Sequence, residues 1–194
     1  MIFKYAFLND IETSAIDDFL LSADENLKNR INRYKKQSDF KRSALGYYLV
    51  EKAYEEFIGS SAPPILFSGN GKPYFEGNKI HFSISHSNNL VVCVLKENEV
   101  GIDAEKIKEF NPKLIDRICT DAEKQYIGNS SERFFEIWTA KEAYSKLTGR
   151  GLAIGLKNID VDIESLNIQG KKLTIKTVKD YIISIVSDWI GSLP

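Results

Sequence analysis

Residues 141–149, KEAYSKLTG, have a counterpart ninety residues earlier in residues 51–59, EKAYEEFIG. At nearly the same offset, the apolar run 90–95, LVVCVL, is matched by 181–186, YIISIV. Both nine-residue segments have a helical period, and both apolar runs have the composition of strands. The repetition therefore predicts two similar α+β lobes joined near Asn98, each a long helix followed by the strands of a small sheet.

The rest of the chain fits this division. We expect long helices over 39–58 and 131–147 and a short helix over 110–120. Alternating or apolar runs predict strands at 2–7, 81–85, 90–95, 100–105, 159–163, 173–177 and 181–186. The predicted fold class is α+β, with two pseudo-symmetric lobes at 1–98 and 99–194, each a long helix packed on a small antiparallel sheet.

Composition excludes several kinds of protein. The 194 residues carry a net charge of −1, so any binding of a polyanion must come from a local patch such as the basic stretch 28–42. With two histidines and two cysteines, a multi-histidine metal site and a disulfide framework are both excluded. No apolar run approaches the ~20 residues that span a bilayer, and the first residues do not read as a signal peptide, so we expect a cytoplasmic protein.

Two pairs of carboxylates share one spacing. Asp103 and Glu105 lie two apart on a predicted strand and so point to the same face, where a cation would relieve their repulsion. Asp160 and Asp162 have the same spacing between apolar neighbours. Either pair, taken alone, is more often solvated surface than a metal site, and spacing does not choose between them.

The helix over 131–147 places Glu142 and Lys146 one turn apart. Such a pair is ordinarily a surface ion pair, worth about 0.3–0.5 kcal/mol. The adjacent Lys141 and the bulky Trp138 make this stretch unusually crowded, which favours a functional role. Together with Asp103 and Glu105, the helix offers oxygen ligands for a hard cation and ammonium groups for phosphate.

Four segments occur in an order that resembles the Sfp-type 4′-phosphopantetheinyl transferases. The segments are KRSALG at 41–46, GKP at 71–73 with FSISHS at 82–87, GIDAE at 101–105, and WTAKEAYSK at 138–146. Members of this family move the phosphopantetheine arm of coenzyme A onto a serine of an acyl or peptidyl carrier protein. The family shows two pseudo-symmetric lobes with the active site between them, which agrees with the ninety-residue echo.

The resemblance implies roles for individual residues. Asp103, Glu105 and Glu142 would be magnesium ligands, with Asp103, Glu142 and Lys146 the catalytic residues. The predicted contacts to coenzyme A come mainly from the first lobe and are Arg30, Arg42, Lys72, Ser85 and His86, joined by Lys141 and Lys146 from the second lobe. Lys28 is a poor substitute for a second basic residue near Arg30, and the Asp160 and Asp162 pair falls outside the motifs.

The implied reaction is that of a holo-[acyl-carrier-protein] synthase type of enzyme. A carrier serine attacks the phosphorus that bears the pantetheine arm, and adenosine 3′,5′-bisphosphate leaves while magnesium and Lys146 offset the developing charge. Glu142 is the favoured base, and a metal-bound water is the alternative. The carrier, acyl or peptidyl, would serve fatty acid, polyketide or nonribosomal peptide biosynthesis. The enzyme would be a monomer without nucleic-acid or membrane partners.

The segment after the carboxylate strand is a candidate surface for an acidic carrier. It combines an apolar stripe with basic residues, namely Lys106, Lys108, Lys113, Arg117, Phe110, Leu114, Ile115 and Ile118. An equally good interpretation is a short amphipathic helix that covers the sheet.

Two other functions are compatible with parts of the sequence. A magnesium-dependent nucleotide phosphohydrolase would use the same carboxylates with water as the nucleophile and without a protein partner. A non-catalytic nucleotide- or RNA-binding module would use the basic stretch 28–42, but it gives no reason for Asp103, Glu105 and Glu142.

Overall fold

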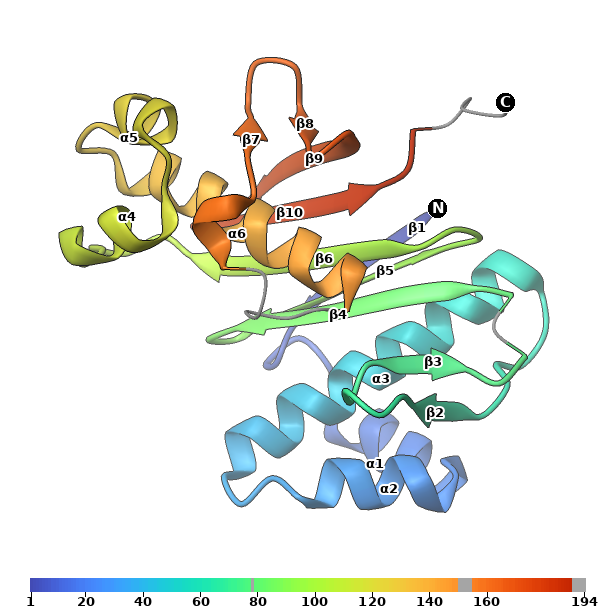
Figure 1. Cartoon of the computed structure of the whole chain (residues 1–194). Helices are drawn as coiled ribbons and strands as arrows, with labels where there is room; N and C mark the ends of the chain where they lie inside the picture. The colour runs from blue at the N-terminus through green and yellow to red at the C-terminus, as the bar shows by residue number, and fades with distance from the viewer. Residues whose placement is uncertain (78, 150–154, 190–194) are drawn as a thin grey trace. The chain divides into compact units, whose positions relative to one another are not determined.

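The computed structural model describes residues 1–77, 79–149 and 155–189. The chain divides into two compact units, Met1–Asn98 and Glu99–Pro194. Each unit has its own hydrophobic core. Figure 1 labels the helices and strands of both units.

The first unit is built on a three-stranded antiparallel sheet and one long helix. The sheet has the order β1-β5-β4, from Ile2–Phe7, Leu90–Lys96 and His81–Ser87. Helix α3 (Gln37–Ile58) packs on this sheet, and α1 (Thr13–Ser22) and α2 (Glu25–Asn32) pack on α3. A separate hairpin consists of β2 (Ile65–Phe67) and β3 (Pro73–Phe75).

Burial explains why α3 lies where it does. Its residues Ala44, Val50 and Ala53 are fully buried and share a core with Val91 and Cys93 of β5. The helix ends at Gly59, which has a φ of 82° and donates its backbone N–H to the carbonyl of Glu55 at 2.8 Å. A left-handed residue at this position favours glycine.

The second unit repeats the plan with a larger sheet. Its order is β6-β10-β9-β8-β7, from Val100–Lys106, Tyr181–Ser187, Lys171–Val178, Asn167–Ile168 and Val161–Asp162. Helix α6 (Ser131–Thr148) packs against β6 and β10. Between β6 and α6 lie α4 (Pro112–Ile118) and α5 (Asp121–Ile127), and the short 3₁₀ helix η2 (Leu156–Asn158) precedes β7.

The predicted fold class is confirmed, and the echo falls on equivalent elements. Residues 51–59 form the end of α3 and 141–149 the end of α6, and both segments close on a glycine of positive φ, Gly59 and Gly149. The echoed apolar runs are β5 and β10, which each lie between two neighbouring strands of their sheet. None of the described helices has the length and apolar composition needed to cross a membrane.

Several local predictions were incomplete. The basic stretch 28–42 is not one helix but spans the end of α2, a break at 33–36 and the start of α3. Helices α1 and α5 were not predicted, although α5 begins with a complete capping box of Thr120 and Glu123. The expected strand 159–163 shrinks to two paired residues, because β8 opposite it is equally short.

Candidate active site

Strand β6 presents the first two carboxylates to α6. Gly101 faces the helix, since a Cβ built there would lie 2.0 Å from the Ala143 carbonyl oxygen. Alternation along the strand then turns Asp103 and Glu105 to the same side. Asp103 is only 6% exposed and Glu105 is half-buried, so only the first of the two is largely removed from water.

Gly101 is what permits this approach of helix and strand. Besides the carbonyl of Ala143, an added Cβ would meet the backbone nitrogen of Leu147 at 2.7 Å. Both obstacles are backbone atoms, which cannot move aside as a side chain can. The glycine of the GIDAE motif therefore has a steric role, and it brings the end of α6 to the carboxylates.

A buried hydrogen bond fixes the same helix on the middle of the sheet. The hydroxyl oxygens of Thr139 on α6 and Ser184 on β10 lie 2.7 Å apart, and neither side chain is exposed. Ser184 is the cross-strand partner of Asp103. Neither residue was predicted for the site, although Thr139 lies within the WTAKEAYSK motif that marked it.

Lys146 and Glu142 complete the group in this unit. Lys146 donates from Nζ to Oδ1 of Asp103 at 2.8 Å. Burial raises the pKa of the Glu142 carboxyl above its usual range, Asp103 and Glu105 raise it further, and Lys146 lowers it. The structure thus brings together Asp103, Glu105, Glu142 and Lys146, which the sequence had placed on a strand and a distant helix.

The donor set suits a hard cation in its chemistry. Carboxylate oxygens are the ligands that magnesium prefers. Burial is the main cause of the raised pKa of Glu142, and the like charges of Asp103 and Glu105 add to it; a cation would relieve that second, smaller effect. Within residues 1–77, 79–149 and 155–189, however, no three Asp, Glu, His or Cys side chains are gathered closely enough to hold a metal ion. The magnesium ligands therefore stay a prediction.

Lys141 requires a correction. It was predicted to contact coenzyme A, but its side chain is 0% exposed and its Nζ has three protein acceptors. Those acceptors are the carbonyl of Ile118, the carboxylate of Glu123 and the carbonyl of Leu156. An ammonium group has three N–H donors, so this arrangement leaves none for a ligand.

The second carboxylate pair lies on the solvated surface. Asp160 and Asp162 are exposed, and Asp162 accepts hydrogen bonds from the backbone N–H and hydroxyl of Ser165 at 3.1 and 2.6 Å. These bonds lower the pKa of Asp162 and close the turn between β7 and β8. Packing against α6 distinguishes Asp103 from Asp162, which the spacing alone did not.

In the first unit, Arg42 joins α3 to the turn after His86. It donates to the carbonyl of Asn88 at 3.0 Å and pairs with Asp39. Its Nε is buried and has no hydrogen-bond partner among the described residues. An unsatisfied buried donor on a guanidinium is a candidate contact for an anion, because leaving such a group unpaired is costly.

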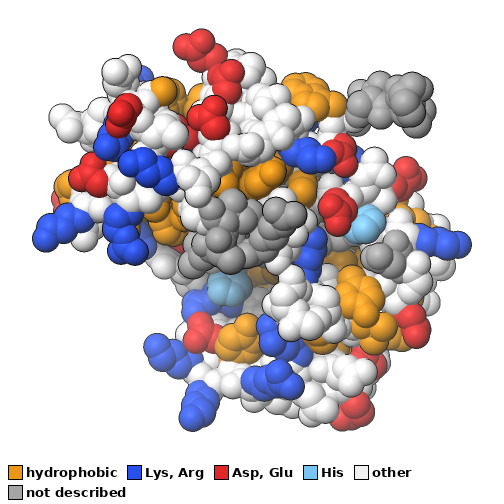
Figure 2. Space-filling model, viewed as in Figure 1, with side chains coloured by type: hydrophobic (Ala, Val, Ile, Leu, Met, Phe, Trp, Pro, Cys, Tyr) orange, Lys and Arg blue, Asp and Glu red, His pale blue; other side chains and the backbone are white. Residues whose placement is uncertain are grey.

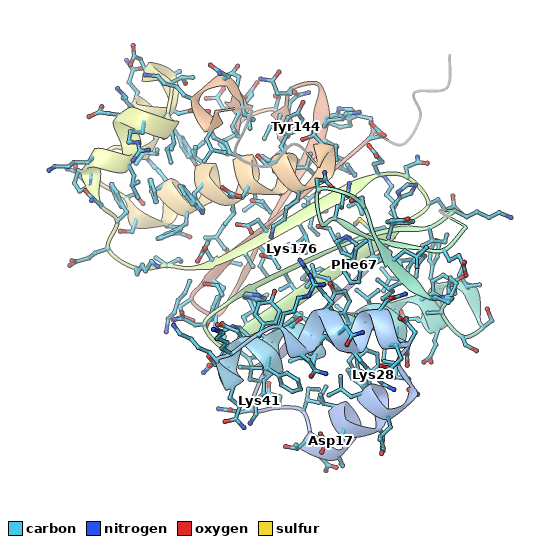
Figure 3. The ribbon with its side chains drawn as sticks, turned by 60° about the horizontal axis from the view of Figure 1, so that its bottom comes forward. Asp17, Lys28, Lys41, Phe67, Tyr144 and Lys176 are labelled. Carbon is cyan, nitrogen blue, oxygen red and sulfur yellow. The ribbon has the colours of Figure 1, made fainter. Side chains whose placement is uncertain are left out.

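Arg30 lines a pocket of about 780 Å³ in the same unit. Its guanidinium lies 5.4 Å from the centre of the Phe67 ring, which Figure 3 labels on the hairpin next to α2. Burial raises the pKa of Tyr47 to about 12, against the opposing effect of the neighbouring Arg30. The arginine is thus held by two aromatic side chains rather than left free in solvent.

The remaining pocket residues are largely polar. They come from α2 and from the hairpin, namely Asn26, Asn29, Arg33, Leu66, Ser68, Gly69, Asn70, Gly71 and Tyr74. The sequence predicts Arg33 only as part of the basic stretch 28–42. It does not predict Phe67 for the site, because it does not show that the hairpin reaches α2. Lys and Arg side chains gather over the region of α2 and the start of α3 (Figure 2).

The other predicted coenzyme contacts occupy different elements of this unit. Lys72 belongs to the hairpin turn, where its carbonyl accepts from the Ser68 backbone at 3.0 Å and the preceding Gly71 has a φ of 83°. Ser85 and His86 are neighbours on β4, the first buried and the second exposed. Of the five predicted residues in this unit, only Arg30 lines the pocket.

The apolar and the basic residues of the candidate carrier surface have different surroundings. Leu114 and Ile115 of α4 and Phe110 before it pack against the core of the second unit, and Phe110 stacks on Phe134 with ring centres 4.5 Å apart. Part of the apolar stripe therefore covers the core. Lys113 and Arg117 remain exposed on α4 and are available to an acidic partner.

Comparison with known proteins gives one family for both units. Residues 99–187 match the family model of the 4′-phosphopantetheinyl transferase superfamily, and residues 15–98 match that of the 4′-phosphopantetheinyl transferase N-terminal region. The boundary between the two matches lies at Asn98, where the first compact unit also ends.

Individual relatives carry the same description. The 4′-phosphopantetheinyl transferase gsp of Aneurinibacillus migulanus is 35% identical over 137 residues, which cover 67% of this chain and 57% of the relative. The corresponding transferase psf-1 of Bacillus pumilus is 34% identical, covering 65% of this chain and 58% of the relative. Sfp of Bacillus subtilis strain 168 is 28% identical, covering 69% and 63%.

The matched region thus spans less than two thirds of these relatives. The family-model match at 99–187 includes the strand with Asp103 and Glu105 and the helix with Glu142 and Lys146. With both units matched and the motifs folded onto equivalent elements, the chain belongs to the Sfp-type family of 4′-phosphopantetheinyl transferases.

Proposed function

We propose that this protein transfers the 4′-phosphopantetheine arm of coenzyme A to a serine of an apo acyl or peptidyl carrier protein, with magnesium as cofactor. The observation that carries the proposal is the group on β6 and α6, in which Lys146 binds the largely buried Asp103 beside a Glu142 of raised pKa. The family membership of the chain supports the same reaction.

The proposed roles follow from the protonation behaviour of these residues. Either Glu142 or a metal-bound water would take the proton of the carrier serine. The raised pKa of Glu142 favours this carboxylate as the base, whereas direct ligation to magnesium would lower its basicity and favour the water. As the serine oxygen bonds to phosphorus, the bond from phosphorus to the bisphosphate oxygen breaks, and Lys146 would neutralise or protonate that oxygen.

Magnesium, when bound, would supply electrostatic stabilisation of the diphosphate charge. Asp103, Glu105 and Glu142 would hold it. Since Asp103 is paired with Lys146 in this structure, the proposal implies that Lys146 exchanges this carboxylate for the substrate phosphates. The nucleotide phosphates of coenzyme A would be bound in the first unit by Arg30, Arg42, Lys72, Ser85 and His86. The unpaired Nε of Arg42 supports this assignment.

The direct test is the intact mass of candidate apo carriers after incubation with coenzyme A, magnesium and this protein. The proposal requires the gain of one phosphopantetheine group on the carrier, and loss of that gain when a chelator removes magnesium. Asp103→Ala should abolish transfer, whereas the matched exposed carboxylate variant Asp162→Ala should leave it unchanged. An essential Asp162 together with a dispensable Asp103 would show that the site is misassigned.

A reaction without carrier tests the phosphohydrolase alternative. Coenzyme A, magnesium and protein alone should give no adenosine 3′,5′-bisphosphate if the enzyme is a transferase, while a hydrolase would release it. Salt-sensitive RNA binding without turnover would instead support the nucleic-acid-binding alternative. The proposal includes a monomeric enzyme, since one chain holds all the assigned residues, and light scattering would check this.

A further inference from the structure

Lys141 lies on the side of α6 that faces away from the sheet. Two residues before it, Thr139 reaches Ser184 of β10, and two residues after it, Ala143 lies against Gly101 of β6. At 3.6 residues per turn, a residue midway between two sheet-facing positions points to the opposite side of the helix. The side chain of Lys141 is nevertheless 0% exposed, so other segments of the protein must cover this outer side of α6.

Three separate segments meet at this lysine. Its Nζ donates to the carbonyl of Ile118 at 2.7 Å, to Oε2 of Glu123 at 2.7 Å and to the carbonyl of Leu156 at 3.1 Å. These acceptors belong to the end of α4, the first turn of α5 and the start of η2. A single side chain of α6 thus binds the α4–α5 segment and the start of η2, which together cover this side of the helix.

Glu123 extends the network to two backbone groups. Its Oε2 accepts from the N–H of Thr120 at 2.8 Å, and its Oε1 accepts from the N–H of Val161 at 3.1 Å. The carboxylate is only 2% exposed. Every polar group in this network that is named here has a partner, which is the condition for a buried charged network to specify one geometry.

We infer that Lys141 and Glu123 are a positioning pair, which fixes the α4–α5 segment on the back of the helix that carries Glu142 and Lys146. The kinetic part of this inference rests on the proposed function, with the acidic carrier expected at the candidate carrier surface, which includes the exposed Lys113 and Arg117 of α4. A buried ion pair is a weak source of stability, since apolar residues of similar volume often replace it without loss. Its directional bonds instead set where α4 and α5 stand relative to α6.

The decisive variant combines Lys141→Met with Glu123→Leu. We expect it to melt at or above the temperature of Lys141→Met alone, which leaves an unpaired buried carboxylate. Hydrogen exchange at the amides of Thr120 and Val161 should nevertheless be about tenfold faster than in the wild type or more, since their shared acceptor is gone. The KM for the carrier should rise about tenfold, and the KM for coenzyme A should stay within about twofold.

Lys124→Ala is the matched control. Lys124 also links α5 to α4, through Asp116 at 3.0 Å, but this pair is exposed. We expect this variant to leave both KM values and both exchange rates unchanged. Glu123→Gln, which keeps the shape of the side chain, provides an intermediate case if Lys141→Met does not fold.

Wild-type exchange rates and carrier KM in the double variant would overturn the positioning role. Equal increases of both KM values would also contradict it, because they indicate a general loss of structure. If the wild-type protein modifies no carrier, the proposed function fails instead, and the exchange rates of Thr120 and Val161 still decide whether the pair holds these segments.

Discussion

At the residue scale, the two lysines of the WTAKEAYSK motif have opposite surroundings. Lys146 is one-third exposed and binds Asp103, whereas Lys141 is fully buried and bound to Glu123. Both are ammonium groups within two turns of one helix, and only the direction of each side chain separates their roles. The partial exposure of Lys146 fits its proposed role toward a substrate, whereas the buried ion pair of Lys141 fits a structural one.

Lys146→Ala should lower turnover by about 10²–10³-fold, as removal of a preorganised charge at a reacting oxygen typically does. Lys146→Arg should restore part of the rate if charge alone is needed and little if a proton must be given, because guanidinium does not release its proton. Steady-state kinetics with coenzyme A and carrier would measure both. Lys52→Ala is the control, since Lys52 forms an exposed pair with Glu55 on α3 and its loss should leave turnover intact.

The protonation of Glu142 gives a second prediction at this scale. Because burial and then Asp103 and Glu105 raise its pKa, we expect its titration in the metal-free protein at higher pH than an ordinary glutamate. Protonated Glu142 is favoured by folding, so its contribution to stability is present below the unfolded pKa and lost as pH rises through the folded pKa.

Carbon-detected NMR of labelled glutamate would follow this titration. Glu105→Gln should lower the pKa of Glu142, because it removes a like charge, and Lys146→Met should raise it, because it removes a cation. Shifts in the opposite directions would show that these groups do not share one electrostatic site.

At the element scale, the contact of α6 with β6 is the feature that brings Glu142 and Lys146 to Asp103. It depends on Gly101, where any Cβ meets two backbone atoms of the helix. The buried bond between Thr139 and Ser184 then holds the helix over β10. The position of the carboxylates relative to α6 therefore depends on the strand, the helix and Gly101 together.

Gly101→Ala should destabilise the fold by about 3 kcal/mol or more, because the clash is with backbone and requires α6 to move. Denaturant unfolding would measure the loss, and activity should fall with it as Glu142 and Lys146 leave Asp103. The control is Gly69→Ala, where an added Cβ meets nothing within 4 Å and the stability should barely change. Equal stabilities for the two variants would contradict the tight approach.

At the scale of the whole molecule, the two units have the same plan and different chemistry. Each packs a long helix ending in a left-handed glycine on an antiparallel sheet. The first unit holds the polar pocket with Arg30 and Arg33, and the second holds Asp103, Glu105 and Glu142. The proposed reaction assigns the nucleotide phosphates to the first and the diphosphate chemistry to the second.

Dephospho-coenzyme A tests this division of roles. It lacks the 3′-phosphate assigned to Arg42, Lys72 and His86, and each charge-assisted hydrogen bond contributes about 1.5–3 kcal/mol. Its KM should therefore be about tenfold higher or more, with a smaller effect on turnover. Arg42→Gln should reduce the difference between the two substrates, because it removes one of the three assigned contacts. Equal KM values in the wild type would place the 3′-phosphate elsewhere.

The sequence by itself determined the repeated α+β plan and the residue types of the proposed catalytic group. Period, composition and glycine stops are local properties of the chain, and they were sufficient for α3, α6, β5 and β10. Short elements such as α5 and β8 were not predicted, because their local signals are weak.

Only the tertiary structure decided the surroundings of residues that look equivalent in the sequence. Asp103 is buried against α6 while Asp162 caps an exposed turn, and Lys141 points to Glu123 rather than to a ligand. The pocket arginine Arg30 rests on Phe67, from a hairpin that is remote in the sequence. The physical reason is the same in each case. A side chain's period sets the face on which it lies, but the partner that covers that face comes from a distant part of the chain, and that partner decides whether the side chain is solvated, structural or chemically active.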